Sequence, residues 1–339
     1  MKHVMVLAAC LMLTTDMRAQ VPTARDEAQP SEVGTTGVVP TDKTAPVFRS
    51  TIELVALNVV VTDLRQQLVG GLSSSDFVVF EDGVRQDVSF FAASDVALDL
   101  AILLDTSASM NDKMGIMQRA ALGFTSTLRP GDRAMIVDIK DATKVIHPLA
   151  AAAGGMAAAI KSTRASGGTG LYNGLYMTFK ELAKARTAAG GEMRRQAIVV
   201  LSDGQDTTSL MSFDDVMEVA KQAGIATYTI TLRSPELTPY EQSRKSRYFS
   251  QTEFSMRVLA QETGGQAFFP LQIGELDGVC SAIAKELASQ YALGYTPKTL
   301  HQDGRFRRIV VQVSDRPEMR IRTRSGYVSN RRSPSGTLE

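Results

Sequence analysis

The chain has 339 residues, of which 44% are hydrophobic and 22% are charged. These are ordinary values for a folded globular protein, and they exclude a largely disordered chain. The formal charge of +1 at pH 7 and the absence of a long basic run argue against nucleic-acid binding. At this length we expect a main domain with a smaller satellite.

The N-terminus has the pattern of a secretory signal. Lys2 and His3 precede an apolar run from Val4 to Leu13, and a polar stretch follows to about Ala19. The run is too short to span a bilayer, and its position fits export better than a buried helix. We therefore predict a signal peptide over residues 1–19, no integral membrane span, and a secreted, periplasmic or cell-envelope location.

The two cysteines of the chain carry separate expectations. Leu7-Ala8-Ala9-Cys10 resembles the box at which bacterial lipoproteins are cut and acylated, but the apolar run before it is short. Lipid anchoring at Cys10 is therefore the minor alternative. Cys280 would be the one cysteine left after cleavage, which excludes an intrachain disulfide. Its apolar helical surroundings predict a buried core residue.

Residues 20–47 are rich in Pro, Thr, Gly and acidic residues and have no hydrophobic period, which predicts a flexible linker. Residues 48–93 then form an N-terminal β segment that begins with a strand from Ile52 to Val61. Further on, two runs of β-branched and aromatic residues flank Glu81-Asp82-Gly83. Asp-Gly between such runs indicates a hairpin.

Residues 94–290 alternate between short apolar strands and amphipathic helices. The first strand, 98–104, is a continuous apolar run, which is typical of a strand buried on both faces of a parallel sheet. A helix follows to residue 128, with Asn111 as its predicted N-cap. Further strands are expected at 134–139, 144–149, 197–201, 225–232 and 266–271, and further helices at 156–162, 171–186, from 213, 254–263 and 276–291. This alternation predicts an α/β domain whose central, mostly parallel sheet is wrapped by helices.

Residues 291–328 return to strands and form a C-terminal β segment. Because strands precede and follow the α/β core, we expect this segment to pack with residues 48–93 in one small flanking β domain, a sheet or a sandwich. The polar stretch 234–250 reads as a surface insertion. Residues 329–339 read as a disordered tail.

Three loops carry oxygen ligands at the carboxyl ends of predicted strands, where open α/β sheets bind ligands. Asp105, Ser107 and Ser109 follow the first strand, Thr169 lies in a glycine-rich loop, and Asp203 follows a later strand. Carboxylates and hydroxyls without a nearby thiol or imidazole suit Mg²⁺, or alternatively Mn²⁺ or Ca²⁺, and suit zinc poorly. Neutral hydroxyls would leave such an ion electrophilic toward an incoming carboxylate.

These loops, in this order, resemble the metal-ion-dependent adhesion site (MIDAS) of the von Willebrand factor type A (VWA) domain. Each motif alone is usually a turn or a helix cap, whereas three in the family's order form a specific pattern. The motifs are Asp-x-Ser-x-Ser from Asp105, Gly-Gly-Thr ending at Thr169, and Leu-Ser-Asp-Gly containing Asp203. The resemblance covers residues 94–289.

The resemblance implies a Rossmann-like fold and a metal ion held by the five side chains. It also implies an adhesion-type module that binds a protein partner through an acidic side chain of that partner. The flanks resemble an acidobacterial-type subgroup of VWFA-related proteins, through Asp76-Phe77 and Glu81-Asp82-Gly83 before the core and Gly294-Tyr295 and Arg324-Ser325-Gly326-Tyr327 after it.

Other acids near the predicted loops, Asp138, Asp141 and Asp206, could support the ligands from behind, but the pattern favours solvated loop acids. We expect no enzyme, because His147 and His301 read as ordinary surface residues and no Gly-x-Ser-x-Gly elbow is present. A metal-dependent hydrolase is the alternative, since a hard ion can activate water. A structural envelope protein with a vestigial metal site is another. The partner's identity and the oligomeric state stay open.

Overall fold

The computed structural model describes residues 54–93, 96–151, 154–188, 193–232, 251–299 and 301–329, without the side chain of Ile273. All of them belong to one compact unit, Thr51–Glu339. The predicted signal peptide and linker, the polar stretch 234–250 and the tail after Ser329 lie outside the described residues. No helix among the described residues is both long and apolar enough to cross a membrane.

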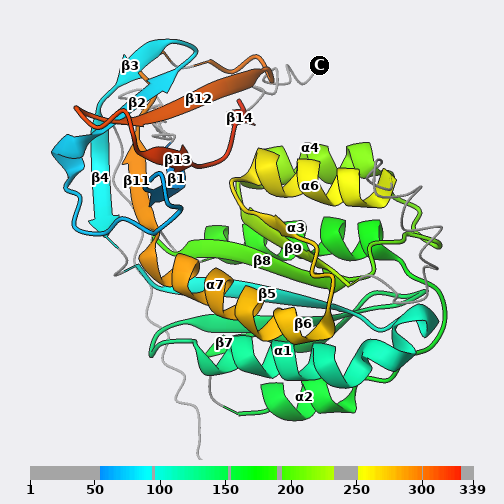
Figure 1. The fold of residues 1–339 in the computed structure, drawn as a ribbon. Coiled ribbons are helices and arrows are strands. Elements are labelled where there is room, and N and C mark those ends of the chain that lie inside the picture. Colours follow the sequence, from blue (N-terminus) through cyan, green and yellow to red (C-terminus); the bar gives the residue numbers. More distant parts are fainter. Residues whose placement is uncertain are drawn as a thin grey trace, which may run out of the picture. The chain divides into compact units, whose positions relative to one another are not determined.

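A six-stranded sheet with the order β10-β9-β8-β5-β6-β7 forms the centre of the α/β part (Figure 1). Its strands are β5 (Leu98–Asp105), β6 (Arg133–Ile139), β7 (Lys144–Ala151), β8 (Arg195–Ser202), β9 (Ala226–Thr231) and β10 (Ala267–Phe268). All neighbouring strands are parallel except β6 and β7. Every residue of β5 and β8 is buried, which accounts for their continuous apolar runs.

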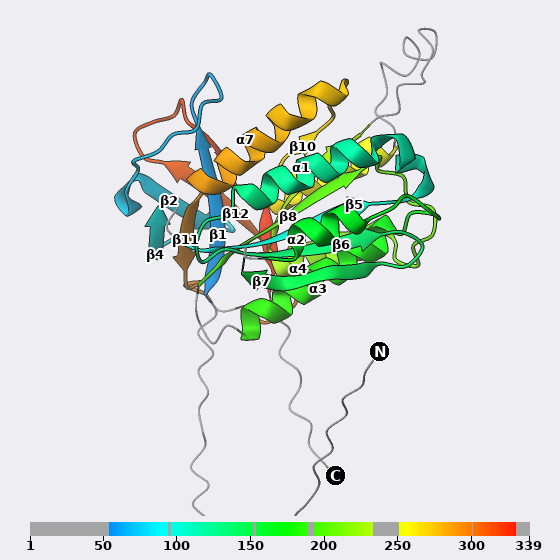
Figure 2. The same cartoon turned by 90° about the horizontal axis from the view of Figure 1, so that it is seen from below.

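Helices cover both faces of this sheet (Figures 1 and 2). Their bounds are α1 (Met114–Ser126), α2 (Met156–Ser162), α3 (Leu171–Ala188), α4 (Phe213–Ala223), α6 (Gln251–Thr263) and α7 (Leu276–Ser289). Side chains of α1, α2 and α7 share one hydrophobic core, and those of α3, α4 and α6 share another. Cys280 of α7 is buried in the first core, as predicted. The predicted α/β class with a mostly parallel sheet is confirmed.

Two predicted boundaries were wrong for local reasons. Asn111 does not cap a helix, because the chain leaves β5 in a tight turn and forms the 3-10 helix η2 (Ala108–Lys113) before α1 begins. The predicted strand 266–271 shrinks to the two residues of β10. Pro270, which has no N–H to donate, follows β10 closely and disfavours a longer ladder.

Two four-stranded antiparallel sheets form a sandwich at the other end of the unit, with the orders β13-β1-β11-β4 and β14-β12-β2-β3. Their strands are β1 (Val55–Thr62), β2 (Phe77–Glu81), β3 (Val84–Gln86), β4 (Val88–Ala93), β11 (Tyr291–Tyr295), β12 (Phe306–Val313), β13 (Arg320–Arg322) and β14 (Gly326–Val328). The sandwich has a hydrophobic core of its own, which contains Leu57, Phe77 and Tyr291. The predicted flanking β domain of N- and C-terminal strands is therefore confirmed, in its sandwich form.

The hairpin at Glu81-Asp82-Gly83 is present as β2–β3, with Glu81 opposite Val84. Asp82 and Gly83 both have positive φ angles, of 47° and 83°, which is the geometry that this two-residue turn requires.

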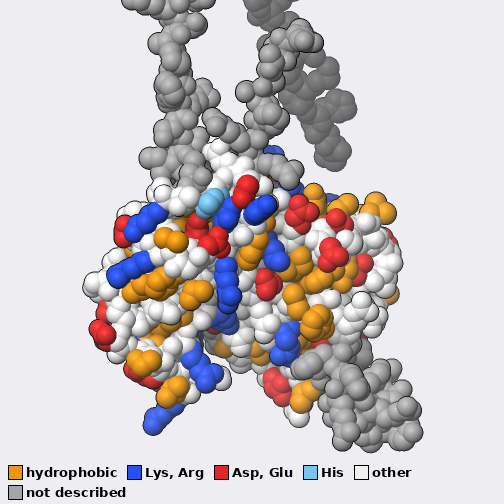
Figure 3. Space-filling view, turned by 90° about the horizontal axis from the view of Figure 1, so that it is seen from above, with side chains coloured by type: hydrophobic (Ala, Val, Ile, Leu, Met, Phe, Trp, Pro, Cys, Tyr) orange, Lys and Arg blue, Asp and Glu red, His pale blue; other side chains and the backbone are white. Residues whose placement is uncertain are grey.

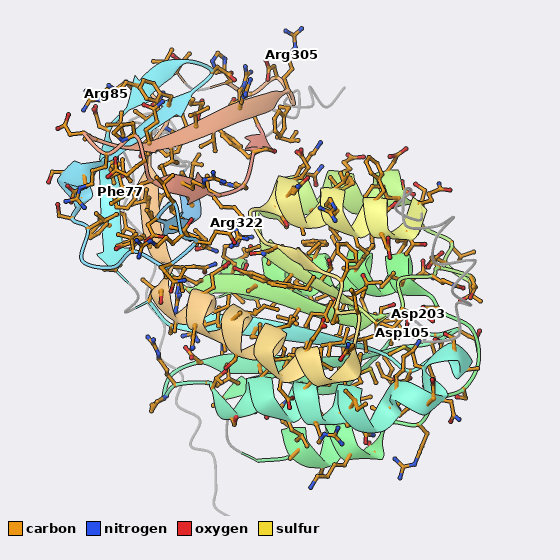
Figure 4. All side chains as sticks on the ribbon, in the orientation of Figure 1. Phe77, Arg85, Asp105, Asp203, Arg305 and Arg322 are labelled. Atoms are coloured by element: carbon orange, nitrogen blue, oxygen red, sulfur yellow. The ribbon has the colours of Figure 1, made fainter. Side chains whose placement is uncertain are left out.

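The α/β part is inserted into one sheet of the sandwich. β4 leads into β5, α7 leads into β11, and β4 and β11 pair antiparallel with Ala93 opposite Tyr291. The chain thus leaves the sandwich and returns to it at adjacent points. This places the carboxyl ends of the central strands, with their loops, at the end of the α/β part away from the sandwich (Figure 4).

Candidate metal centre

Asp105 and Asp203 lie at the same rim of the central sheet. Asp105 is the last residue of β5, Asp203 directly follows β8, and the two strands are parallel neighbours with Leu104 opposite Leu201. Figure 4 shows the two residues side by side at this rim. Asp105 is fully buried and Asp203 is half-buried, so the pair spans the depth of the rim from the sheet to the surface.

The carboxylate of Asp105 is held from both sides. The Ser107 backbone N–H donates to Oδ1 over 3.0 Å, and the Ser202 hydroxyl donates to Oδ2 over 2.5 Å. Burial raises the pKa of Asp105, and the negative charge of Asp203 adds to that rise, while the hydrogen bonds from Ser107 and Ser202 oppose it. Two carboxylates at one partly buried rim repel each other, and a bound cation would relieve this repulsion.

The hydroxyls of Ser107 and Ser109 lie 3.1 Å apart in the first loop. Ser107 is buried, whereas Ser109 is exposed. The turn that brings them together is closed by a hydrogen bond from Met110 N–H to the Ser107 carbonyl, 3.0 Å long. The two serines therefore offer oxygens at successive depths beside Asp105.

Backbone hydrogen bonds tie the glycine-rich loop to the first loop. Ser166 N–H donates to the Thr106 carbonyl over 2.8 Å, and Ala108 N–H donates to the Gly167 carbonyl over 3.0 Å. Thr169, in the same loop, is buried. These bonds bring the loop of Thr169 next to the loop of Ser107 and Ser109.

The third loop is tied to the glycine-rich loop at Thr169 itself. Thr207 N–H donates to the Thr169 carbonyl over 2.9 Å, and Thr169 N–H donates to the Thr207 hydroxyl over 2.8 Å. Within the described ranges, Thr169 makes its hydrogen bonds through its backbone, so its side-chain hydroxyl is not consumed in holding the loop. All three predicted loops thus meet at one rim.

Three acids that the sequence favoured as solvated loop residues instead brace these loops. The carboxylate of Asp138 accepts a hydrogen bond from the Thr106 hydroxyl. Asp141 accepts from Gly168 N–H over 2.8 Å, and Asp206 accepts from Tyr172 N–H over 3.2 Å. A Cβ at Gly167, where φ is +72°, would lie 2.1 Å from a carboxylate oxygen of Asp141. Glycine at this position therefore permits the approach of Asp141.

Sequence reasoning missed Ser202 and Thr207 as parts of this site. Ser202 lies inside the Leu-Ser-Asp-Gly motif, so the motif was a signal for it. Thr207 had no signal, because its contacts with Thr169 arise only when two distant loops fold together. His147 lies in β7 and His301 lies between β11 and β12, outside the three loops.

The donor set at the rim fits a hard divalent cation. It combines two carboxylates, from Asp105 and Asp203, with the hydroxyls of Ser107, Ser109 and Thr169. No group of three or more His, Cys, Asp or Glu that could hold a metal occurs within the described part of the chain. A cation here would therefore depend on hydroxyl oxygens, which suit Mg²⁺ and do not suit zinc.

The family model described as von Willebrand factor type A domain matches residues 100–205, a range that contains the five predicted ligands. No curated protein sequence matches the chain.

Solved structures similar to this chain include a von Willebrand factor type A protein from Catenulispora acidiphila, with a TM-score of 0.45, 12% identity, and coverage of 84% of this chain and 76% of that one. Proximal thread matrix protein 1 from the mussel byssus has a TM-score of 0.44 and 15% identity over 58% of this chain, which spans 49% of the mussel protein. The vWF domain of the type V pili tip protein Mfa5 from Porphyromonas gingivalis has a TM-score of 0.42 and 12% identity over 56% of this chain and 94% of that one.

Proposed function

We propose, because the family model of the von Willebrand factor type A domain matches residues 100–205, that this chain is an exported binding protein that captures a partner's carboxylate through a divalent cation. The proposed export rests on the signal peptide that the sequence predicts over residues 1–19. The observation that carries the proposal is that two carboxylates, of Asp105 and Asp203, share one rim. Burial and the negative charge of Asp203 raise the pKa of Asp105 there.

Mg²⁺ is the proposed ion, with Mn²⁺ or Ca²⁺ as alternatives, and its proposed ligands are Asp105, Ser107, Ser109, Thr169 and Asp203. When bound, the cation supplies a positive centre to which a carboxylate oxygen can coordinate. Asp105 and Asp203 balance its two charges. The three neutral hydroxyls hold the ion without reducing its attraction for a further anion.

The protein's own contribution is to keep this donor set in place before the partner arrives. The hydrogen bonds between the loops, and the acids Asp138, Asp141 and Asp206 behind them, fix the loop backbones. A prearranged site loses less conformational entropy on binding. Because Ser109 is exposed and Asp203 is half-buried, a protein partner with a protruding acidic side chain can reach the rim.

We propose no catalytic role for this rim. Hydrolysis would need a general base beyond the ligands, within reach of a metal-activated water. The side chains that contact Asp105 are serine hydroxyls, and the two histidines of the α/β and β parts lie elsewhere.

Metal binding is tested by calorimetric titration of Mg²⁺ and Mn²⁺ into the chain without residues 1–19. Asp203→Asn should weaken Mg²⁺ binding by at least about tenfold, because it removes one of two charged ligands. Asp105 is fully buried, so Asp105→Asn, which keeps its shape, is a better variant than alanine. Asp277→Asn, an exposed change on α7, is the matched control. Unchanged Mg²⁺ affinity in Asp203→Asn and Asp105→Asn would rule out the site.

Partner capture is tested separately, by affinity purification from envelope extracts on the immobilised chain with Mg²⁺ and with EDTA. Ser107→Ala should reduce the Mg²⁺-dependent capture by a larger fraction than it reduces the free energy of unfolding, since the hydroxyl serves the metal and not the core. Capture that is the same with EDTA as with Mg²⁺ would contradict a metal bridge.

A further inference from the structure

A second candidate binding site lies in a cleft of about 700 Å³ between the sandwich and the α/β part. Residues of β1, β13, the edge strand β10 and the last turns of α7 line the cleft. None of the five proposed metal ligands is among them. In Figure 4, Arg322 of the cleft lies at the opposite end of the central sheet from Asp105 and Asp203.

Strand alternation and helix spacing determine which side chains of β13 and α7 face the cleft. Alternate residues of a strand point to opposite faces, and Ile321 packs on the sandwich core, so Arg320 and Arg322 point away from that core. On α7, Lys285 and Glu286 follow Ala282 by three and four residues and share its face. Two elements from different halves of the unit therefore turn charged side chains toward one space.

Positive charge is in excess in this cleft. Its lining contains Lys285, Arg320 and Arg322 against a single acid, Glu286. The Glu286 carboxylate is already engaged, because it accepts a hydrogen bond from the Tyr228 hydroxyl and forms an ion pair with Arg322.

Arg322 is engaged as well, because it also donates to the Gln266 side chain over 2.7 Å. The other two basic side chains remain available to an anion. Lys285 and Arg320 are exposed, and neither forms a salt bridge with another residue of the described ranges. Figure 3 shows several Lys and Arg side chains across the middle of one face of the molecule.

Two of the three strands that line the cleft, β10 and β13, are edge strands. β10 ends the six-stranded sheet and β13 ends a four-stranded sheet, and residues of both line the cleft. An edge strand presents unpaired backbone N–H and C=O groups, which bind extended peptides in many recognition sites. The apolar side chains of Leu68 and Phe268, which are exposed and half-buried respectively, add a surface for the peptide's uncharged residues.

We propose that this cleft binds an extended acidic peptide segment of a partner protein. Carboxylates of the segment pair with Lys285 and Arg320, and its backbone lies along an edge strand. Charge complementarity selects the acidic sequence, since every uncompensated charge of the lining is positive. This site is independent of the proposed cation at Asp105.

The test uses the chain without residues 1–19 and a fluorescein-labelled peptide of alternating glutamate and threonine, which places all carboxylates on one face when extended. Fluorescence anisotropy should show saturable binding that EDTA leaves unchanged. The double variant Lys285→Gln/Arg320→Gln should raise the Kd about tenfold, because two exposed charge pairs are lost. Both side chains are exposed, so the fold should be retained, which circular dichroism checks.

Arg85→Gln is the matched control, since Arg85 is an exposed arginine on β3, away from the cleft (Figure 4). It should leave the Kd unchanged. The proposal is overturned if a glutamine-for-glutamate version of the peptide binds equally well, or if the double variant binds as the wild type does. Loss of binding in EDTA would assign the peptide to the metal rim, and displacement by an equal concentration of succinate would indicate a site for small anions.

Discussion

Asp99 joins three segments at the amino end of the central sheet. Its buried carboxylate accepts two hydrogen bonds from Arg133 of β6, of 2.8 and 2.6 Å, and one of 2.8 Å from Arg194 just before β8. Burial alone would raise the pKa of Asp99, but the hydrogen bonds and charges of the two arginines outweigh it and hold the pKa below its ordinary value. The ionised form of Asp99 therefore stabilises the fold.

Asp99→Asn should lower the free energy of unfolding by about 2–3 kcal/mol at pH 7, because it removes the charge that pairs with two guanidinium groups. A carboxylate whose pKa is lower in the folded state contributes stability above its unfolded pKa and loses it as pH falls through the folded value. The difference in free energy of unfolding between wild type and variant should thus shrink below about pH 4. Urea unfolding at neutral and acidic pH measures it, with Asp277→Asn as the control. A gap that is the same at both pH values would contradict this account.

Cys280 lies on the buried face of α7, where burial and the charge of Asp277 raise the pKa of its thiol to about 12. The reactive thiolate is therefore scarce at neutral pH. In the chain without residues 1–19, we expect Ellman's reagent to leave native Cys280 unmodified and to label it fully in guanidinium chloride. Rapid labelling of the native protein would show that α7 opens far more readily than its packing indicates.

Among the helices, α4 has the clearest local start signal. Its N-cap Ser212 accepts a hydrogen bond from Asp215 N–H over 3.2 Å, and the Asp215 carboxylate accepts one from Ser212 N–H over 2.7 Å. Gly224 ends the helix with a φ of 62°. Both ends of α4 are therefore encoded in its own sequence.

Ser212→Ala should reduce the free energy of unfolding by about 1 kcal/mol, because it leaves a first-turn N–H without its partner. Denaturant unfolding should show a lower midpoint at an unchanged m value. Ser126→Ala, an exposed serine at the end of α1, should change stability by less than about 0.5 kcal/mol. An equal effect of the two substitutions would remove the capping interpretation.

Elements whose pattern is local could be predicted from the sequence. α4 begins at Phe213 as expected, with the N-cap Ser212 before it, and β12 (Phe306–Val313) lies in the segment that was expected to return to strands. The direction of β7 was recoverable too. Only residues 140–143 join it to β6, and so short a connection requires antiparallel pairing. The short length of β10 could not be predicted, because it depends on its partner strand β9 and on Pro270.

The three loops of the candidate metal centre were also predictable, because each follows a strand or precedes a helix and carries a recognisable motif. The residues that brace them were not. Whether Asp141 faces solvent or Gly168, and whether Thr207 reaches Thr169, depends on how loops far apart in the chain pack. The five proposed ligands remain a prediction, as does the acidobacterial-type subgroup.

At the scale of the whole unit, the sandwich and the α/β part have separate cores joined by adjacent crossing points. Ala93 and Tyr291, the residues next to the crossing, are directly opposed in the β4–β11 ladder. Two opposed residues in an antiparallel pair can be joined by a two-residue turn. The α/β part should therefore be removable without disturbing the strand order of the sandwich.

Replacing residues 94–290 by Asn-Gly should give a folded sandwich with lower stability than the parent, since contacts such as Arg322 with Glu286 are lost. Dispersed amide signals in NMR and cooperative thermal unfolding would establish the fold. A chain with the same turn in place of residues 94–290 and Leu57→Asp in the sandwich core is the negative control. An unfolded product from the Asn-Gly chain would mean that the sandwich depends on the α/β part for its formation.

The same insertion sets an order of assembly during synthesis. In its sheet β1 lies between β11 and β13, and both of these are made only after the whole α/β part has emerged. Until then the apolar run of β1 has neither neighbour, and such an unpaired strand readily pairs with another chain. Premature termination before β11 would therefore leave a folded α/β part that carries an unpaired, aggregation-prone N-terminal strand.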